Sequence, residues 1–296
     1  PVVVLPQDPA PVVALNLTNQ CTSAEGSFEI EVSLPTAGIA PYSFSINGGA
    51  FQTRTAPFTI TNLSSGTHTV EVRDANGCGN LDTITIEPPI GITPAITALP
   101  TCANDDGVIT VTAIGGSSNY SYAISPNAGS IVLIGNVFSG VPSGTYTITV
   151  TDTNTSCTAD VSVTLEAATP VAFTADPTPV SCFGGADGTI TVNLPASNDD
   201  PVYTYAIIAG PSTVPAQNSK VFTGLSAGNY TVEVTSGRGC SSTVDVTITE
   251  PTELTVSGVA TDFACALDNS KSVSTLTITA VGGTTDYVYS IDGTNY

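Results

Sequence analysis

The sequence predicts an all-β protein made of tandem Ig-like antiparallel β-sandwich modules arranged as an extended rod. Three observations lead to this prediction. Cysteines recur with a period of about 80 residues, strand-like segments recur in the same phase, and the composition favours strands and turns over helices. A unit of this length that alternates short strands with turns is typical of a β-sandwich.

Charged residues make up only 10% of the 296 residues, so Thr, Ser, Asn and Gly must form much of the surface. Thr, Val and Ile suit pleated strands, while Gly, Asn, Asp and Pro suit turns. The net charge of −20 disfavours nucleic acid and anionic lipid as partners. Solubility explains this acidity, and binding of divalent cations or of a cationic surface is the alternative. No apolar run reaches the roughly 18–20 residues of a membrane span, so direct membrane insertion is not expected.

The cysteines form two interleaved series. The first series is Cys21, Cys102, Cys182 and Cys265, spaced by 81, 80 and 83 residues. The second series is Cys78, Cys157 and Cys240, spaced by 79 and 83 residues. We therefore predict one disulfide in each module: Cys21–Cys78, Cys102–Cys157 and Cys182–Cys240. Cys265 is expected to be unpaired, because its partner would lie beyond Tyr296. Zinc binding is less favoured, since the sequence has no CxxC pair.

Three kinds of strand keep the same phase as the cysteines, each alternating apolar and polar residues as a half-buried strand does. One follows the first cysteine, at 28–32, 109–111, 190–192 and 276–278. A tyrosine-rich strand recurs at 42–46, 120–124, 203–207 and 287–291. A third begins with glycine, at 66–72, 144–150 and 228–234.

Prolines mark the joins between modules, because proline ends strand pairing. They occur at 87–89, 166–170 and 250–251, directly after the last strand of each module. The predicted organisation is a tail of a preceding segment at 1–10, followed by four Ig-like repeats. Module 1 spans 11–89, module 2 spans 90–169, module 3 spans 170–251 and a partial module 4 spans 252–296.

The segment that leads into the glycine-initiated strand resembles the tyrosine corner of Ig-like folds, in which a tyrosine caps the turn before it. Tyr146 and Tyr230 hold this position in modules 2 and 3, and His68 holds it in module 1. We expect His68 to be a structural corner residue rather than a ligand or a base.

Longer motifs make the resemblance specific. Module 3 carries CFGGADGTITV at 182–192, LSAGNYTVEV at 225–234 and ITEP at 248–251. These segments resemble the SprB-type repeat, and the resemblance extends over about 11–296. That family occurs in giant cell-surface adhesins of gliding Bacteroidota. The resemblance implies secretion, display at the cell surface and a role in adhesion or gliding. Module 1 departs from the pattern because it lacks the Cys-Phe-Gly-Gly opening.

No catalytic site is expected, because one histidine and five scattered cations provide no group to activate a nucleophile or stabilise an oxyanion. No cofactor is expected either, with one weak alternative. If the cysteines pair within modules, Glu25 would lie near Asp74 and Asp106 near Asp152, and oxygen-rich turns of this kind can hold Ca²⁺. The favoured explanation is that these turns simply require Asp, Asn and Gly. Ser236 interrupts the acidic pattern in module 3.

The leading functional hypothesis is a structural stalk or filament segment of a secreted cell-surface adhesin. Two alternatives are an array of glycan-binding modules and the accessory repeats of a secreted hydrolase. Glycan sites usually need exposed aromatic residues, and most Tyr and Phe fall in phase with the core, which favours the stalk. The expected partners are other modules of the same chain, with surface polysaccharide or further copies of the chain as additional candidates.

Overall fold

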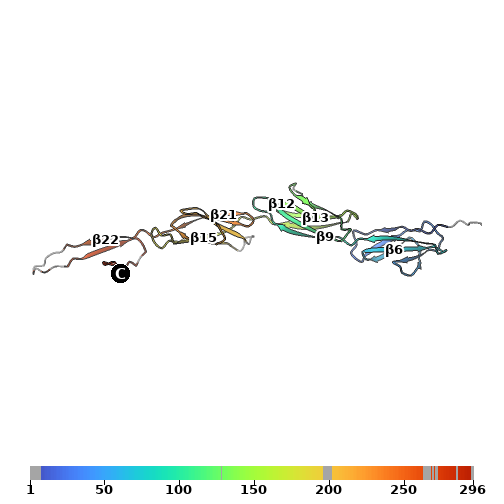
Figure 1. Cartoon of the computed structure of the whole chain (residues 1–296), viewed down its shortest axis with the longest axis horizontal. Coiled ribbons are helices and arrows are strands. Elements are labelled where there is room, and N and C mark those ends of the chain that lie inside the picture. Colours follow the sequence, from blue (N-terminus) through green and yellow to red (C-terminus); the bar gives the residue numbers. More distant parts are fainter. Residues whose placement is uncertain are drawn as a thin grey trace, which may run out of the picture. The chain divides into compact units, whose positions relative to one another are not determined.

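The computed structural model describes residues 8–127, 129–195, 202–262, 268, 270, 273–284 and 286–294. Within these residues the chain is all-β, as predicted, and no helix is present that could cross a membrane. The hydrogen-bonded strands form separate antiparallel sheets, and each sheet takes all its strands from one predicted module (Figure 1).

Module 1 has seven described strands that form a three-stranded sheet, β1-β2-β5, and a four-stranded sheet, β4-β3-β6-β7. The strands are β1 (Leu15–Leu17), β2 (Phe28–Val32), β3 (Ser43–Ile46), β4 (Gln52–Thr53), β5 (Phe58–Leu63), β6 (Gly66–Arg73) and β7 (Gly79–Ile86).

Module 2 has sheets β11-β12-β9-β8 and β10-β13-β14. This division into four and three strands is that of a constant-type Ig domain. In the other two modules the fourth strand pairs with the third strand instead, so that it belongs to the opposite sheet. The strands are β8 (Gly91–Ala98), β9 (Gly107–Ile114), β10 (Tyr120–Ser125), β11 (Val132–Ile134), β12 (Val137–Val141), β13 (Gly144–Asp152) and β14 (Thr158–Leu165).

Module 3 repeats the arrangement of module 1, with sheets β15-β16-β19 and β18-β17-β20-β21. Two further strands, β22 (Thr255–Ala260) and β23 (Leu276–Val281), pair with each other in the region of module 4. The strands of module 3 are β15 (Thr174–Thr178), β16 (Gly188–Asn193), β17 (Tyr203–Ala209), β18 (Val214–Gln217), β19 (Val221–Leu225), β20 (Gly228–Ser236) and β21 (Ser241–Ile248).

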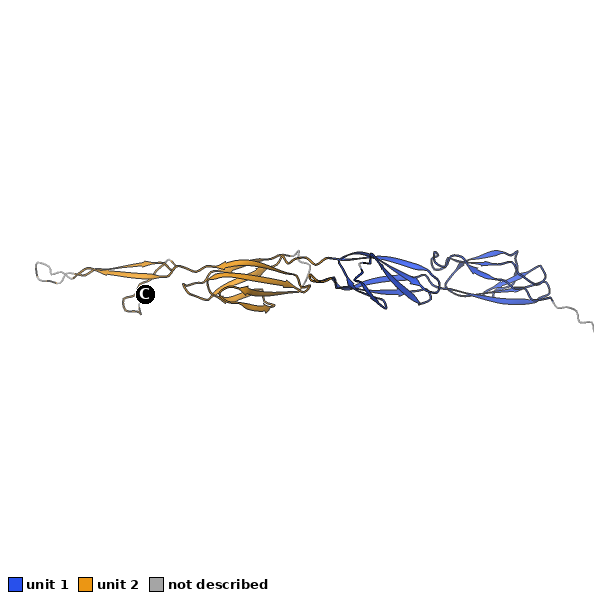
Figure 2. Cartoon of the chain, turned by 90° about the horizontal axis from the view of Figure 1, so that it is seen from above, with its two compact units in different colours: residues 1–100, 105–166 blue, residues 101–104, 167–296 orange. Residues whose placement is uncertain are grey.

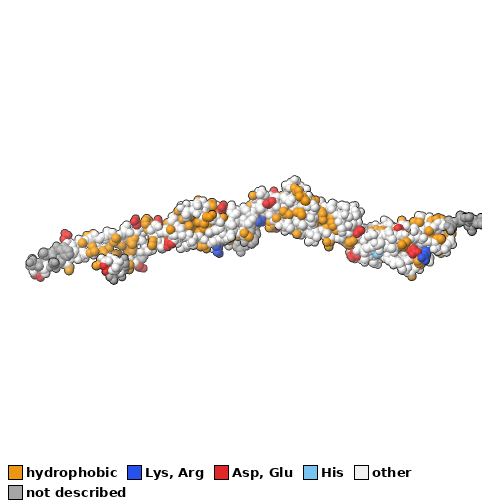
Figure 3. Space-filling model, viewed as in Figure 1, with side chains coloured by type: hydrophobic (Ala, Val, Ile, Leu, Met, Phe, Trp, Pro, Cys, Tyr) orange, Lys and Arg blue, Asp and Glu red, His pale blue; other side chains and the backbone are white. Residues whose placement is uncertain are grey.

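Each of the first three modules has its own hydrophobic core between its two sheets. The period-two pattern places alternate residues of each strand in that core, as in β20, where Tyr230, Val232 and Val234 are buried. The surface is poor in charge, and on the face that Figure 3 shows, red and blue side chains are sparse among uncoloured polar groups and backbone. Uncharged groups therefore form most of this face.

The contacts divide the chain into two compact units (Figure 2). Unit 1 contains residues 1–100 and 105–166, and thus modules 1 and 2. Unit 2 contains residues 101–104 and 167–296. The short segment 101–104, which follows β8 of module 2, therefore belongs with module 3 by its contacts.

The strand directions place the two cysteines of a module at opposite ends. In module 2 the first strand, β8, runs from the end at which the chain enters to the end from which it leaves, and β9 runs back antiparallel to it. The loop between them, which carries Cys102, therefore lies at the exit end. The last two strands, β13 and β14, are joined by a turn at the entry end, and Cys157 lies in that turn. The same order of strands applies to modules 1 and 3.

Candidate functional site

The structure contains two disulfides among the described residues, and each connects the first-series cysteine of one module to the second-series cysteine of the next. Cys21 is bonded to Cys157 across 136 residues, and Cys102 is bonded to Cys240 across 138 residues. The Cα–Cα distances of 5.0 and 5.1 Å are normal for disulfides. We call each such connection, with its surrounding turns, a joint.

The predicted pairs Cys21–Cys78, Cys102–Cys157 and Cys182–Cys240 are therefore wrong. The prediction assumed that both cysteines of a module lie at one end of the sandwich, whereas the strand order separates them by the length of a strand. Cys78 and Cys182 are free and exposed. Cys265, expected to be unpaired, lies outside the described residues.

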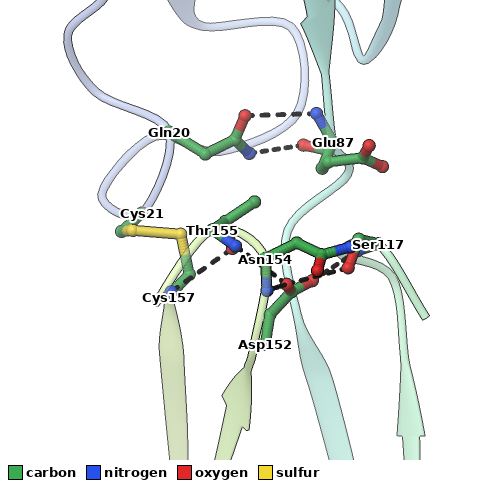
Figure 4. The surroundings of a disulfide bond; sticks show 8 residues. All are labelled: Gln20, Cys21, Glu87, Ser117, Asp152, Asn154, Thr155 and Cys157. Carbon is green, nitrogen blue, oxygen red and sulfur yellow. Dashed lines mark hydrogen bonds between the residues drawn. A yellow bond between two sulfur atoms is a disulfide. The ribbon is translucent and has the colours of Figure 1, made fainter. Parts of the chain in front are cut away.

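In the first joint, the loop that carries Cys21 is fastened to the end of its own module (Figure 4). The Gln20 side chain donates a hydrogen bond to the Glu87 carbonyl oxygen at 2.7 Å and accepts one from the Glu87 amide at 3.1 Å. Glu87 directly follows β7, so this pair holds Cys21 beside the point at which the chain leaves module 1. These contacts of the Cys21 loop lie within module 1 and do not involve module 2.

The turn that carries Cys157 is organised by Asp152, whose side chain is fully buried. One carboxylate oxygen accepts hydrogen bonds from the amides of Asn154 and Thr155, at 2.9 and 3.0 Å, and from the Ser117 hydroxyl at 2.9 Å. The other accepts from the Ser117 amide. Burial raises the pKa of Asp152, but these hydrogen bonds outweigh burial and lower the pKa to about 2. The carboxylate therefore stays ionised and fixes the turn that presents Cys157.

Equivalent turns in the other modules use the same position. Asp74 accepts hydrogen bonds from the amides of Asn76 and Cys78, both at 2.9 Å. In module 3, the Ser236 hydroxyl accepts from the Cys240 amide at 3.3 Å. The residue four or five positions before each second-series cysteine thus shapes the turn, which is the explanation favoured from the sequence.

Two consecutive glycines, Gly115 and Gly116, contact the proline join between modules 1 and 2. The Gly116 amide donates to the Pro88 carbonyl oxygen at 2.8 Å. A Cβ atom on Gly115 would lie 2.0 Å from the Pro89 carbonyl oxygen, so only glycine fits there. Gly282 and Gly283 make the same contacts with the residues just before β22.

In the second joint, a backbone hydrogen bond accompanies the disulfide. The Cys102 amide donates to the Arg238 carbonyl oxygen at 3.0 Å. The Arg238 side chain is buried, and it donates to the Ala167 carbonyl oxygen at 3.3 Å, at the start of the join to module 3. Sequence reasoning missed Arg238 and Gln20. Each residue type occupies its position in only one of the modules, so neither belongs to a recurring motif.

The corner residues lie where the sequence predicts them. The Tyr146 hydroxyl donates to the Pro142 carbonyl oxygen at 3.1 Å, and the Tyr230 hydroxyl donates to that of Ser226 at 2.9 Å. Both tyrosines are buried. His68 Nε2 is 2.8 Å from the Ser64 carbonyl oxygen, which can only accept, so Nε2 carries the proton. All three side chains therefore make the contact with the preceding turn that a structural corner residue is expected to make.

The carboxylates proposed as weak calcium ligands do not come together. Glu25 lies in the exit-end loop of module 1, where it accepts a hydrogen bond from the Ser65 amide at 2.8 Å, and Asp74 lies at the opposite end. Asp106 and Asp152 are separated in the same way in module 2. Across the described part of the chain, no three His, Cys, Asp or Glu residues gather as metal ligands would.

The family model for the SprB repeat matches two segments of the chain. The matched residues are 100–129, which start in the loop after β8 of module 2, and 174–212, which start with β15 of module 3. No curated protein matches the chain.

Several solved structures are similar at low identity. A 282-residue C-terminal fragment of intimin, in complex with the intimin-binding domain of its translocated receptor, is 13% identical, with a TM-score of 0.39. The match covers 58% of this chain and 67% of the intimin chain. Three N-terminal domains of the outer capsid protein Hoc of bacteriophage RB49 are 11% identical, with a TM-score of 0.35 and coverage of 81% and 99%. The S-layer protein fragment rSbsC(31-844) is 14% identical, with a TM-score of 0.34 and coverage of 92% and 50%.

Proposed function

We propose that this chain of SprB-type repeats is a segment of a secreted stalk or filament that holds an adhesive region away from a cell surface, in adhesion or gliding motility. The observation that carries the proposal is the pairing of cysteines between consecutive modules. A disulfide within a module would stabilise only that module. A disulfide between modules adds a second covalent connection at each join, which is useful where the connection itself must withstand force.

The chemistry of the joints supports this role. At the first joint the chain passes from module 1 to module 2 through Pro88-Pro89, which is a stiff connection. The Cys21–Cys157 bond forms a second connection beside it, and Gly116 hydrogen-bonds to the join. Two connections side by side resist bending and twisting far better than one. We infer that modules 1 and 2, which belong to one compact unit, keep a nearly fixed orientation.

Extracellular location belongs to the same proposal. Structural disulfides persist in oxidising surroundings and are rare in reduced cytosol. The acidic, Thr-rich surface is suited to solubility, and the buried tyrosines are committed to corners and cores rather than to an exposed sugar-stacking face. These features favour the stalk over the glycan-binding alternative.

Small-angle X-ray scattering on the oxidised chain tests the proposal. Modules about 30–40 Å long, placed end to end, would give a rod of about 100–140 Å and a radius of gyration of about 30–40 Å. A compact globule of 296 residues would have a radius of gyration of about 19 Å. The matched control replaces Cys21, Cys157, Cys102 and Cys240 with serine, and it should show a broader distribution of interatomic distances. A compact radius for the oxidised chain would overturn the stalk.

A further inference from the structure

Among the described residues, the joint that would follow module 3 has only the side that module 3 and the following chain provide. Its exit-end loop, between β15 and β16, carries Cys182, the third member of the first cysteine series. The two earlier members of that series are Cys21 and Cys102. Each is bonded to a cysteine in a turn of the next module. Cys182 is exposed and free. The question is what the surroundings of Cys182 are shaped to receive.

The loop around Cys182 is fastened to its own module, as the Cys21 loop is. The Gly184 amide donates to the Glu250 carboxylate at 2.9 Å, and the Val180 amide donates to the Thr249 carbonyl oxygen at 3.1 Å. Within the loop, the Ser181 amide donates to the Asp187 carboxylate at 3.0 Å, and hydrogen bonding from Ser181 lowers the pKa of Asp187. These contacts hold the Cys182 thiol beside the exit of module 3.

The cavities at the two places correspond position by position. At the first joint, Cys21 lines a cavity with Pro88, Pro89, Ile90 and Gly116 on one side and Thr155, Cys157 and Thr158 of the incoming turn on the other. At module 3, Cys182 lines a cavity with Thr252, Glu253, Leu254 and Gly283. These four are the counterparts of the first four, since Gly283 hydrogen-bonds to Thr252 as Gly116 does to Pro88. No counterpart of the turn is present among the described residues.

The size and lining of the second cavity match a missing turn. Its volume is about 330 Å³, against about 80 Å³ where the turn of module 2 is in place. Two apolar side chains at its rim, Phe183 and Leu254, are 53% and 57% exposed. The counterpart of Leu254, Ile90, is partly buried, where it packs against the core of module 2 and lines the cavity of the completed joint. A turn seated here would cover apolar surface, which stabilises the contact.

We propose that the Cys182 loop, Leu254 and Gly283 form a socket for the cysteine-bearing entry-end turn of a complete module in the place of 252–296, and that Cys182 forms a disulfide with the cysteine of that turn. The partner is therefore a turn of the kind seen at residues 152–158, folded around its own Asp or Ser side chain. The inference rests on the geometry of the two completed joints and does not require the stalk function.

The bond forms by thiol–disulfide exchange with a small disulfide such as oxidised glutathione. The Cys182 thiolate attacks one sulfur of glutathione disulfide, forms a mixed disulfide and releases one glutathione thiolate. The thiolate of the turn then attacks Sγ of Cys182 and releases the second glutathione thiolate. The two cysteine thiols lose two electrons and two protons, which reduce one glutathione disulfide to two thiols.

A graft tests the proposal in a complete module. Residues 1–291 are followed by 125–166 of module 2, because Tyr287 and Tyr120 hold equivalent positions in the repeat and both donate hydrogen bonds to the carbonyl oxygen of the first of the paired glycines. Non-reducing peptide mapping should find Cys182 joined to the grafted copy of Cys157. In the control graft, with serine at that copy, Cys182 should stay reactive. A folded graft in which Cys182 remains a thiol, or pairs elsewhere, would overturn the proposal.

A second experiment decides the question if the graft does not fold. A peptide of residues 148–161, with its cysteine activated as a thionitrobenzoate mixed disulfide, is added to the 296-residue chain. The variants Cys78→Ser and Cys182→Ser, each made in a chain that also carries Cys265→Ser, separate the two thiols that are exposed among the described residues. Reaction at Cys182 should saturate with peptide and be at least about tenfold faster than at Cys78, whereas activated glutathione should show no such preference. Equal, non-saturating rates with the peptide would refute the socket.

Discussion

Removing one joint is expected to destabilise two modules at once. The perturbation is the double substitution Cys21→Ser with Cys157→Ser. Suppose that module 2 unfolds while module 1 stays folded. Its chain leaves module 1 near Pro88 and is returned to the same end of module 1 by the Cys21–Cys157 bond. The unfolded chain is therefore closed into a loop of about 70 residues, which costs it entropy.

The magnitude follows from that loop. In the chain-entropy account, closing about 70 residues destabilises the unfolded state by about 4 kcal/mol. The opposite case gives nearly the same value, because unfolding module 1 leaves a loop from Cys21 to Pro88 held at the entry end of module 2. Each joint therefore stabilises both of its neighbours by about 4 kcal/mol, whereas a bond within a module would stabilise one.

Hydrogen exchange measured by mass spectrometry distinguishes the modules. The reporters are core strands of the first three modules: β2 for module 1, β13 for module 2 and β20 for module 3. In the double variant, exchange through module opening should accelerate about a thousandfold in β2 and in β13, and it should change little in β20. The control, Cys78→Ser, removes an exposed free thiol and should alter none of them. Acceleration confined to one of β2 and β13 would refute the reasoning.

Three further variants test single contacts. Tyr230→Phe removes the hydroxyl that donates to the Ser226 carbonyl, and urea unfolding should show module 3 weakened by about 1 kcal/mol; an unchanged midpoint would count against the corner. The pKa of Asp152 is lower folded, about 2, than its ordinary 3.8, so its contribution to stability is present above pH 4 and is lost as pH falls toward 2. Asp152→Asn should lack that part of the acid transition in pH-dependent denaturation, and an identical acid profile would contradict it. Gly115→Ala places a Cβ 2.0 Å from the Pro89 carbonyl oxygen at a φ of +79°, and oxidative refolding should give less Cys21–Cys157 bond than the parent chain does. Equal amounts of the disulfide would show that the backbone at Pro89 shifts easily to accommodate the added methyl group.

Fold class and strand positions were predictable because they depend on local and repeated information. The period-two alternation in Phe28–Val32 or Gly144–Asp152 determines which residues face the core, and the period of the cysteines determines where the pattern restarts. The tyrosine corner was predictable for a similar reason. Its hydrogen bond joins residues four positions apart, so one short motif contains both partners.

The cysteine pairing was not predicted, because it depends on which end of the sandwich each loop occupies. Spacing alone fits Cys102 with Cys157 as well as it fits Cys102 with Cys240. The deciding fact is that Cys102 follows the first strand of its module and Cys157 precedes the last. A chain that enters at one end and leaves at the other must then separate them. Gln20 and Arg238 carried no signal, since a single amide or guanidinium in a loop has many possible partners.

The interleaving of the two disulfides determines how the chain can carry force. Cys102 lies inside the loop closed by Cys21–Cys157, and Cys157 lies inside the loop closed by Cys102–Cys240. If every module unfolds under tension, the shortest covalent route runs to Cys21, crosses to Cys157, returns to Cys102 and crosses to Cys240. That route contains about 130 residues. The end-to-end length at which the chain becomes taut is therefore about 480 Å when oxidised and about 1,060 Å when reduced.

Within that route, the segment from Cys102 to Cys157 becomes taut before the two longer segments beside it, so the force passes through the body of module 2. The proline joins at Pro88-Pro89 and at 166–170 lie on the slack segments. Stretching single molecules by their two ends, before and after a reductant, measures both limits. Bonds within modules would shorten the chain by nearly the same amount, so the experiment uses the variant Cys78→Ser with Cys182→Ser, which keeps both interleaved disulfides. Its oxidised limit should remain about 480 Å. The one bond within a module that this variant permits, Cys102–Cys157, would instead give about 870 Å and would refute the interleaving. A limit of about 480 Å in this variant therefore identifies the joints, rather than bonds within the sandwiches, as the part of the molecule that limits its extension.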